Sequence, residues 1–175
     1  GSDFIKDDIV KKRIIQPDKL VPTGLPLDTE NLDKVKKVEK ENLVIFSGRN
    51  VDEKQPWLFK QMRDKLGDNN IEFINTLEHD FSKEEYYNLL SKSKVVVSFA
   101  LQENFGYSVQ EAVYLGCIPI LPNRLVYPEF YSKEYLYDTF DEACSMVLKV
   151  IYGDIKPPMV VRDFQESMER WFWND

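Results

Sequence analysis

The stretch VVVSFALQENFGYSVQEAVYLGCIPILP, residues 95–122, indicates the fold of the chain. It opens with an apolar, β-branched run that predicts a buried strand. A short loop follows, and then a helical pattern that ends at Gly116, a residue type common just after helices. A second apolar strand begins at Ile118. These elements predict one βαβ unit with a right-handed crossover, and ligands of such sheets lie beyond the carboxyl ends of the strands, where residues 103–107 fall.

The same alternation of elements extends on both sides of this stretch. Apolar runs predict three further strands, at residues 43–47, 71–74 and 135–137. Amphipathic patterns predict three further helices, at residues 55–66, 82–93 and 139–152, and capping-box patterns at Ser82 and Thr139 begin two of them. Strands that alternate with helices are typical of a parallel sheet. We therefore predict an α/β fold, a Rossmann-like doubly wound parallel sheet.

The chain of 175 residues is long enough for one domain with a sizeable core. Residues 1–18 are predicted to be a linker or the end of a preceding domain, either as an amphipathic helix or as a tail. Residues 19–158 form the predicted Rossmann-like domain, and residues 159–175 a C-terminal helix rich in Trp and Phe. Because the opening Gly-Ser pair is typical of a cloning remnant, we expect one domain of a longer protein.

Composition narrows the class of function. The formal net charge is -7, so this domain is a poor candidate for gripping the phosphate backbone of a nucleic acid. Cys117 and Cys144 lie in segments whose apolar pattern indicates burial, which predicts two reduced thiols in the core of an intracellular protein. No apolar run approaches the roughly 20 residues of a membrane span. We expect a cytoplasmic protein.

Two cations follow the first predicted strand of the domain. Arg49, next to Gly48, and Lys54 lie in the loop between this strand and the following helix. Their spacing lets both side chains converge on one anion at the carboxyl edge of the sheet. A diphosphate suits them, because a guanidinium binds two oxygens and an ammonium adds a point charge. The alternative is two surface cations paired with Asp52 and Glu53.

Two carboxylates belong to the central βαβ unit. Glu103 follows the buried strand, and Gly106 lets the backbone approach a ligand closely. The free N–H groups of the helix that begins near Tyr107 favour a phosphate in the same space. A carboxylate beside an anion site suits the hydroxyl groups of a sugar, so the pattern predicts a nucleotide-sugar site. For Glu111 the alternative is a capping box with Ser108.

Three motifs together resemble the donor-binding half of the retaining GT-B glycosyltransferases, in their glycogen-synthase-like and sucrose-synthase-like group. That group has a Gly-Arg pair with a lysine five positions on, and two glutamates in a context of the form Glu-x-Phe-Gly…Glu-Ala…Gly-x-Pro. The matching residues here are Gly48-Arg49 with Lys54, residues 103–112, and Gly116-Cys117-Ile118-Pro119. Within the group, residues 111–117 and 125–129 are most similar to mannosyltransferases that modify queuosine in tRNA.

The resemblance implies a role for each matching position. Arg49 and Lys54 would bind the diphosphate and stabilise the leaving nucleotide, Glu103 would hold hydroxyl groups of the donor sugar, and Glu111 would hold the ribose hydroxyls. Other donor-binding positions would be Gly48 and the backbone of Asn104, Phe105, Gly106 and Tyr107. Arg124 would reach the donor or the acceptor, or pair with Glu129. The base would lie near residues 76–81, where His79 is either an ordinary loop residue or a base contact.

The resemblance also implies the partners of the site. The donor would be a UDP-, GDP- or ADP-sugar, and transfer would retain the anomeric configuration without a bound metal or other cofactor. Most acceptor contacts would come from a separate N-terminal domain, so the isolated domain would turn over little, and the acceptor could be a modified nucleic-acid base. Three alternatives stay open: a nucleotide-sugar epimerase of the same fold, a non-catalytic nucleotide-sugar-binding module, and a response-regulator-like domain, whose acidic cluster is not apparent.

Overall fold

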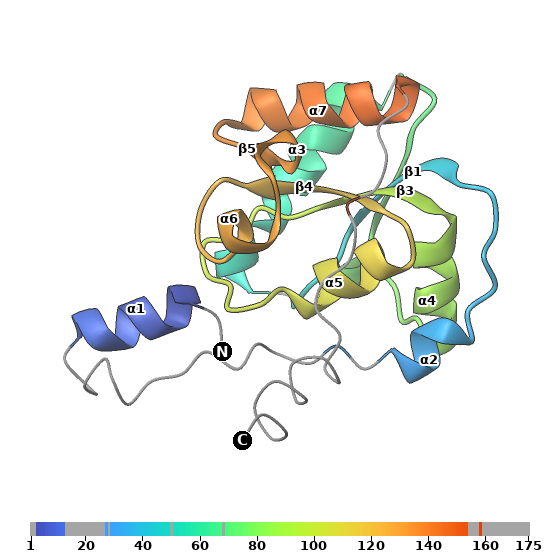
Figure 1. The fold of residues 1–175 in the computed structure, drawn as a ribbon. Helices are drawn as coiled ribbons and strands as arrows, with labels where there is room; N and C mark the ends of the chain where they lie inside the picture. The colour runs from blue at the N-terminus through green and yellow to red at the C-terminus, as the bar shows by residue number, and fades with distance from the viewer. Residues whose placement is uncertain are drawn as a thin grey trace.

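The structure, a computed structural model, describes residues 3–12, 27, 29–49, 51–67, 69–153 and 158. Within these residues the centre of the fold is a five-stranded parallel sheet with the strand order β2-β1-β3-β4-β5 (Figure 1). The strands are β1 (Glu41–Phe46), β2 (Glu72–Asn75), β3 (Ser93–Val97), β4 (Ile118–Pro122) and β5 (Leu136–Tyr137). The prediction of an α/β, Rossmann-like parallel sheet is confirmed.

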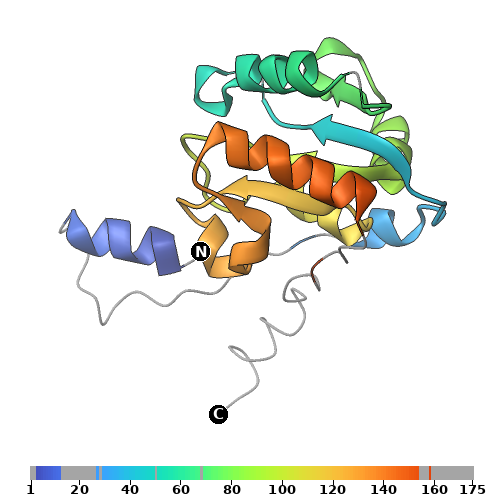
Figure 2. The same cartoon turned by 90° about the horizontal axis from the view of Figure 1, so that it is seen from above.

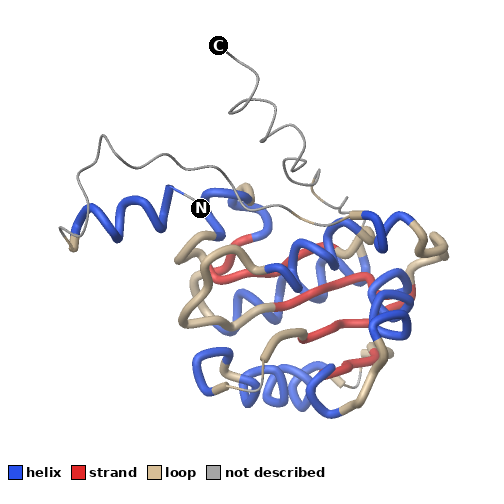
Figure 3. Tube along the Cα trace, turned by 90° about the horizontal axis from the view of Figure 1, so that it is seen from below, coloured by secondary structure: helices blue, strands red, loops and turns tan. Residues whose placement is uncertain are grey.

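Helices cover both faces of the sheet, as Figures 2 and 3 show from opposite sides. The helices α3 (Pro56–Leu66) and α7 (Phe140–Tyr152) cover one face, and α4 (Lys83–Lys92) and α5 (Tyr107–Tyr114) cover the other. Shorter helices complete the described part of the chain: α1 (Asp3–Lys11), α2 (Glu30–Asp33) and α6 (Tyr127–Phe130). Single 3₁₀ turns are η2 (Asp52–Lys54), η3 (Thr76–Glu78) and η4 (Lys133–Tyr135).

The central strands are apolar because both faces of the sheet are covered. Val44, Ile45, Val95 and Val96 are fully buried between the two helical layers. A strand that is buried on both faces needs apolar residues at successive positions, not at alternate ones. This requirement explains the continuous apolar runs in the sequence. The run that begins at Val95 continues past the end of β3, which stops at Val97.

The two predicted capping boxes have different outcomes. The capping box at Ser82 is confirmed. At Thr139 the hydroxyl accepts a hydrogen bond from the N–H of Glu142, but the Glu142 carboxylate accepts from Asp138 N–H, one residue earlier than a capping box requires. Trp57, in the first turn of α3, is half exposed because it lies outside the buried stripe of the helix.

Parts of the predicted domain organisation lie outside the described residues. The predicted C-terminal helix at residues 159–175 is among them. In the first predicted segment, residues 3–11 form the helix α1. The helix α2, in the next charged segment, is a mostly exposed surface helix that buries Leu32 in the core.

Lys40 joins the carboxyl-terminal ends of α4 and α5 at the amino edge of the sheet. Its ammonium donates to the carbonyl oxygens of Leu90, at 3.2 Å, and Leu115, at 2.7 Å, near the ends of α4 and α5. A cation is favoured there because the last carbonyls of a helix carry partial negative charge.

Cys117 and Cys144 are free thiols in the core, and burial raises the pKa of Cys117 to about 11. The prediction of two unpaired core cysteines is confirmed.

No helix within the described ranges has the length and apolar character needed to cross a membrane.

Candidate functional site

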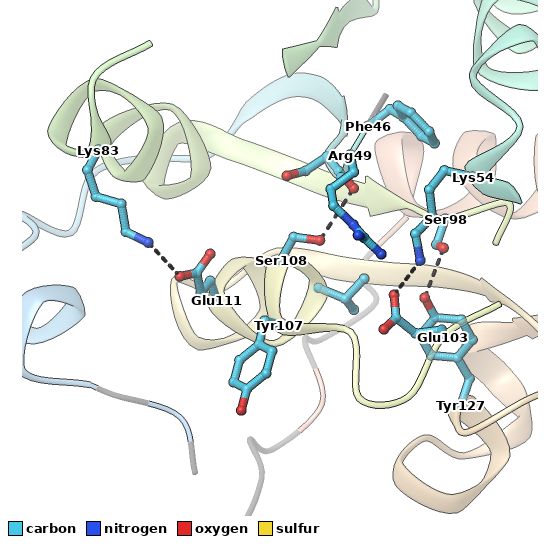
Figure 4. A pocket seen from close by; sticks show the side chains of 13 residues that line it. Phe46, Arg49, Lys54, Lys83, Ser98, Glu103, Tyr107, Ser108, Glu111 and Tyr127 are labelled. Atoms are coloured by element: carbon cyan, nitrogen blue, oxygen red, sulfur yellow. Dashed lines mark hydrogen bonds and ion pairs between the residues drawn. The ribbon is translucent and has the colours of Figure 1, made fainter. Parts of the chain in front are cut away.

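A pocket of about 460 Å³ opens at the carboxyl edge of the sheet. It lies beside the ends of β1 and β3, where the chain order of the strands reverses, because β1 has β2 on one side and β3 on the other. Such a reversal leaves a crevice between loops that diverge to opposite faces of the sheet. The lining residues are Phe46, Ser47, Gly48, Arg49, Lys54, Lys83, Ser98, Glu103, Tyr107, Ser108, Val109, Glu111 and Tyr127 (Figure 4).

The pocket brings together the two cations and the two carboxylates singled out in the sequence. Arg49 and Lys54 enter from the segment after β1, Glu103 from the loop after β3, and Glu111 from α5. Figure 4 shows these four side chains around the same space, with Lys83 at the far end. The expectation that they share one crevice at the carboxyl edge is confirmed. Their roles toward a ligand stay predictions.

Lys54 and Glu103 form an ion pair in the wall of the pocket. The ammonium lies 2.9 Å from Oε2 of Glu103 and also donates to the carbonyl oxygen of Gln102, at 2.7 Å. Both side chains are largely buried, with exposed fractions of 13% and 20%. The other carboxylate oxygen of Glu103 accepts the N–H groups of Asn104, at 3.0 Å, and Phe105, at 3.4 Å. The pair therefore fixes the loop after β3 relative to η2.

The carboxyl group of Glu103 is held ionised by this arrangement. Burial by itself raises its pKa, but the hydrogen bond and the charge of Lys54, with the N–H groups of Phe105 and Asn104, outweigh burial. The pKa of Glu103 is therefore lowered from its ordinary value of 4.5. An ionised carboxylate accepts hydrogen bonds and donates none, so Glu103 suits a ligand that offers hydroxyl groups.

Arg49 behaves differently from Lys54. Its side chain is 79% exposed, and its guanidinium lies 3.6 Å from Glu53, four positions along the chain. The alternative of surface cations paired with neighbouring carboxylates thus describes Arg49, whereas Lys54 pairs with Glu103. Since an exposed ion pair contributes little stability, Arg49 can leave Glu53 for an anion at little cost.

Glycine is required at residue 106, the last residue before α5. Gly106 has a φ of 78°, a left-handed conformation that costs other residues energy. A Cβ atom here would lie 3.3 Å from the Tyr127 ring and 3.6 Å from Cγ of Glu103. The close approach brings the first N–H groups of α5 to the edge of the pocket, where they favour an anion.

Hydrogen bonds join the loops that form the pocket. The backbone N–H of Leu101 donates to the carbonyl oxygen of Glu53 at 2.7 Å, and the Ser108 hydroxyl donates to the carbonyl oxygen of Ser47 at 3.3 Å. Beneath Glu103, the hydroxyls of Ser98 and Tyr127 lie 2.9 Å apart. The segments after β1, β3 and β4 are thus connected before any ligand binds.

Glu111 is held by α4 and not by the start of its own helix. The N-cap of α5 is Gly106, which places Ser108 inside the first turn, so the capping-box alternative for Ser108 and Glu111 is wrong. Instead, Oε1 of Glu111 accepts the Tyr87 hydroxyl at 3.0 Å and lies 3.2 Å from the ammonium of Lys83. The side chain is 15% exposed and faces the pocket.

Four of the predicted donor-binding residues do not line the pocket: Asn104, Phe105, Gly106 and Arg124. Asn104 and Phe105 donate their N–H groups to Glu103, and the Phe105 ring is buried against Phe130, at 5.5 Å between ring centroids. Arg124 donates through Nε to the carbonyl oxygen of Ala100, at 3.2 Å. In this structure these residues shape the loop that carries Glu103.

Other lining residues were not among the predicted site residues. They are Ser47, Lys83, Ser98, Ser108 and Tyr127, together with the apolar Phe46 and Val109. The sequence contained one indication of a role for Lys83: it is a cation in the first turn of a predicted helix, where the helix dipole disfavours positive charge. The sequence contained no such indication for Tyr127, because its position at the pocket depends on how the loop after β4 folds back.

Neither the base contact nor metal independence is tested by these observations. His79, beyond η3, lies against the Phe81 ring at 5.1 Å between ring centroids, and its contact with a base stays a prediction. Over the described ranges, no three His, Cys, Asp or Glu side chains are grouped closely enough to hold a metal ion.

Comparisons with known proteins point to one class of enzyme. No protein-family model matches the chain. The chain is 35% identical over 119 residues to a Drosophila melanogaster protein named tRNA-queuosine alpha-mannosyltransferase, a match that covers 68% of the chain and 28% of that protein. It is 26% identical over 137 residues to a putative glycosyltransferase of Acidianus filamentous virus 1, covering 75% of the chain and 41% of that protein. The chain thus spans less than half the length of either relative, and it is related to glycosyltransferases.

Proposed function

We propose that this chain is the donor-binding domain of a GT-B glycosyltransferase, and that its pocket binds a nucleotide diphosphate sugar. The observation that carries the proposal is the pairing of opposite charges in one crevice. Two cations suit a diphosphate, and two carboxylates suit the hydroxyl groups on either side of it. A sugar nucleotide has this order of groups: sugar hydroxyls, diphosphate, ribose hydroxyls.

The positions in the pocket divide the donor into three parts. Glu103 and Lys54 lie together at one end, which we assign to the sugar and the adjoining phosphate. Glu111 lies at the other end with Lys83, which we assign to the ribose. Arg49, the exposed cation between them, would turn from Glu53 toward the diphosphate. The start of α5 adds N–H groups to the phosphate site.

Transfer would proceed with retention and without a metal ion. As the bond between the sugar and the diphosphate breaks, negative charge grows on the leaving oxygen. Arg49 and Lys54 would stabilise this charge, and preorganised cations in a partly buried site can lower a barrier by several kcal/mol. Glu103 would stay ionised and hold the sugar in place. An acceptor hydroxyl would approach from a domain outside these residues.

The relatives suggest a donor sugar and an acceptor. One of them is named a tRNA-queuosine alpha-mannosyltransferase. We therefore propose mannose as the first donor sugar to test and a modified tRNA nucleoside as the first acceptor. Because this chain has a net charge of -7, the cations that bind the tRNA phosphates would belong to other parts of the enzyme.

Thermal unfolding in the presence of nucleotide sugars tests the donor site. A ligand that binds the folded state raises the melting temperature, and GDP-mannose, UDP-glucose and ADP-glucose distinguish the base and the sugar. We expect stabilisation by at least one of them, and a smaller effect on Glu103→Gln. Lys34→Met, in an exposed ion pair that does not line the pocket, is the control. If none of these donors raises the melting temperature, the proposal is wrong.

Turnover by a full-length enzyme separates transfer from its alternatives. Glu103→Gln is expected to abolish most glycosyl transfer while leaving the fold intact. Unchanged full-length activity in this variant would favour a non-catalytic binding module. Conversion of the donor into its epimer, in the absence of any acceptor, would favour an epimerase of the same fold.

A further inference from the structure

Two residues of α4 hold the carboxylate of Glu111: Lys83, which also lines the pocket, and Tyr87, which does not. Lys83 and Tyr87 are four positions apart, so their side chains lie on one face of the helix. Both contact the same oxygen, Oε1: the Tyr87 hydroxyl at 3.0 Å and the Lys83 ammonium at 3.2 Å. The ammonium also lies 4.9 Å from the centre of the Tyr87 ring. The three groups form a compact cluster that bridges α4 and α5.

The second oxygen of Glu111, Oε2, has no hydrogen-bond partner among the residues that the structure describes. One oxygen is therefore held and the other is free, on a side chain that lines the pocket. A carboxylate oriented in this way can accept a hydroxyl group without first breaking a bond within the protein. Two donors on Oε1 also fix the rotation of the carboxylate plane.

The position of Lys83 needs an explanation beyond the stability of its own helix. It is the first residue of α4, where the helix dipole disfavours a cation, and it is followed by Glu84 and Glu85, which the dipole favours. Tyr87 is buried, and burial raises the pKa of its hydroxyl, which therefore stays a donor at neutral pH. The contact with Glu111 accounts for both residues.

We propose that Lys83 and Tyr87 are positioning residues that aim Glu111 at the ribose hydroxyl groups of the donor. The inference rests on the proposed function, since it assigns the ribose to Glu111. It adds that recognition of the ribose depends on a contact between two helices. Neither Lys83 nor Tyr87 is required to contact the sugar or the diphosphate.

Calorimetric binding of two nucleotides to the chain tests this inference. The probes are GDP and 2′,3′-dideoxy-GDP, with the corresponding uridine pair if UDP binds more tightly. Tyr87→Phe is expected to weaken binding of the ribonucleotide roughly threefold to tenfold, the range of one ordinary hydrogen bond, because Tyr87 acts on the ligand only through Glu111. Binding of the dideoxynucleotide is expected to change less than twofold. Lys83→Met should give the same pattern, and Lys83→Arg should restore part of the loss.

Control variants separate positioning from general damage. Tyr114→Phe, on α5, also removes a phenol hydroxyl that donates to a carboxylate, that of Asp33, outside the pocket. It should leave both affinities unchanged. In Glu111→Gln, adding Tyr87→Phe should have no further effect, because the two residues act as one unit. Chemical unfolding of each variant checks that it is folded.

The possible failures are distinguishable. If the wild-type chain binds ribonucleotides but Tyr87→Phe and Lys83→Met weaken both probes equally, or weaken neither, the positioning role is wrong and the donor site stands. If the wild-type chain binds no nucleotide of either kind, the proposed donor function fails, and the positioning role fails with it.

Discussion

The ammonium of Lys54 lies 2.9 Å from a carboxylate oxygen of Glu103, although 49 positions separate the two residues in the chain. Each residue therefore satisfies a largely buried charge of the other. A diphosphate would compete with Glu103 for Lys54, and a sugar hydroxyl would compete with Lys54 for Glu103. The ion pair holds both side chains in the wall of the pocket and lowers the pKa of Glu103.

Loss of one partner of this pair should destabilise the chain. Lys54→Met leaves the Glu103 carboxylate without its cation, and we expect the free energy of unfolding to fall by about 1–3 kcal/mol, less than for a fully buried pair. The double variant Lys54→Met/Glu103→Gln should regain part of the loss. Urea unfolding measures both. The exposed pair Lys34–Glu30 is the control, with an expected effect below about 0.5 kcal/mol. Equal effects at the two sites would contradict the prediction.

The stability supplied by Glu103 should disappear in acid. Its pKa is lower in the folded chain than its ordinary value of 4.5, so the unfolded state binds more protons as the pH falls. The contribution is complete above about pH 5.5 and is lost as the pH falls through the folded-state pKa. The difference in unfolding free energy between wild type and Glu103→Gln should therefore shrink as the pH falls below about 5.5. Glu85, whose pKa is also lowered by its bonds to Ser82, is present in both proteins and cancels.

Alanine should be tolerated at Gly48 but not at Gly106. Gly106→Ala combines a left-handed backbone with a Cβ atom 3.3 Å from the Tyr127 ring, so we expect a loss of about 1–2 kcal/mol. At Gly48 the nearest atom to a new Cβ would be 3.9 Å away, which is ordinary contact distance. Thermal or urea unfolding of the two variants provides the comparison. If the Gly106→Ala variant were as stable as wild type, the left-handed turn before α5 would not require glycine, and the prediction would be wrong.

Arg49 should matter for binding and not for folding. Its side chain is 79% exposed, so Arg49→Met should change the unfolding free energy by less than about 0.5 kcal/mol. If it turns to the diphosphate as proposed, GDP binding should weaken roughly tenfold, as for the loss of a charged hydrogen bond. Titration calorimetry with GDP and GMP is the measurement, and the loss should be smaller for GMP. Undiminished binding of GDP would remove Arg49 from the site.

Both thiols should be unreactive in the folded chain. Cys117 and Cys144 are buried, and burial raises the pKa of each, that of Cys117 to about 11. Since the thiolate is the reactive species, Ellman's reagent at pH 8 should label the native chain slowly, and the unfolded chain rapidly at two equivalents. Rapid labelling of one equivalent without denaturant would contradict the packing at the amino edge or under α7.

The sequence predicted the elements of the fold more fully than the contacts between them. Apolar runs marked the strands because a doubly covered sheet needs apolar residues at successive positions. The convergence of Arg49, Lys54, Glu103 and Glu111 followed from a general property of parallel sheets, whose carboxyl ends share one edge. No comparable rule pointed to the bond between Tyr87 and Glu111.

That bond depends on the order of strands in space. With the order β2-β1-β3, α4 returns under β1 and lies beside α5, so Tyr87 reaches Glu111. Another order of the same strands would separate the two helices. Local pattern also misplaced Ser108: the Ser108–Glu111 spacing fits a capping box, but Gly106 can adopt a left-handed conformation and begins the helix earlier. Local spacing alone does not decide between such starts.

The hydrogen bond from Leu101 to Glu53 uses main-chain atoms only. Any amino acid except proline can donate it at residue 101, and every amino acid can accept it at residue 53. Side-chain substitutions at residues 53 and 101 should therefore leave the distance between the segments that carry Lys54 and Glu103 unchanged. Neither residue lines the pocket, so the spacing of the charged pair can be inherited unchanged while these two positions drift in sequence.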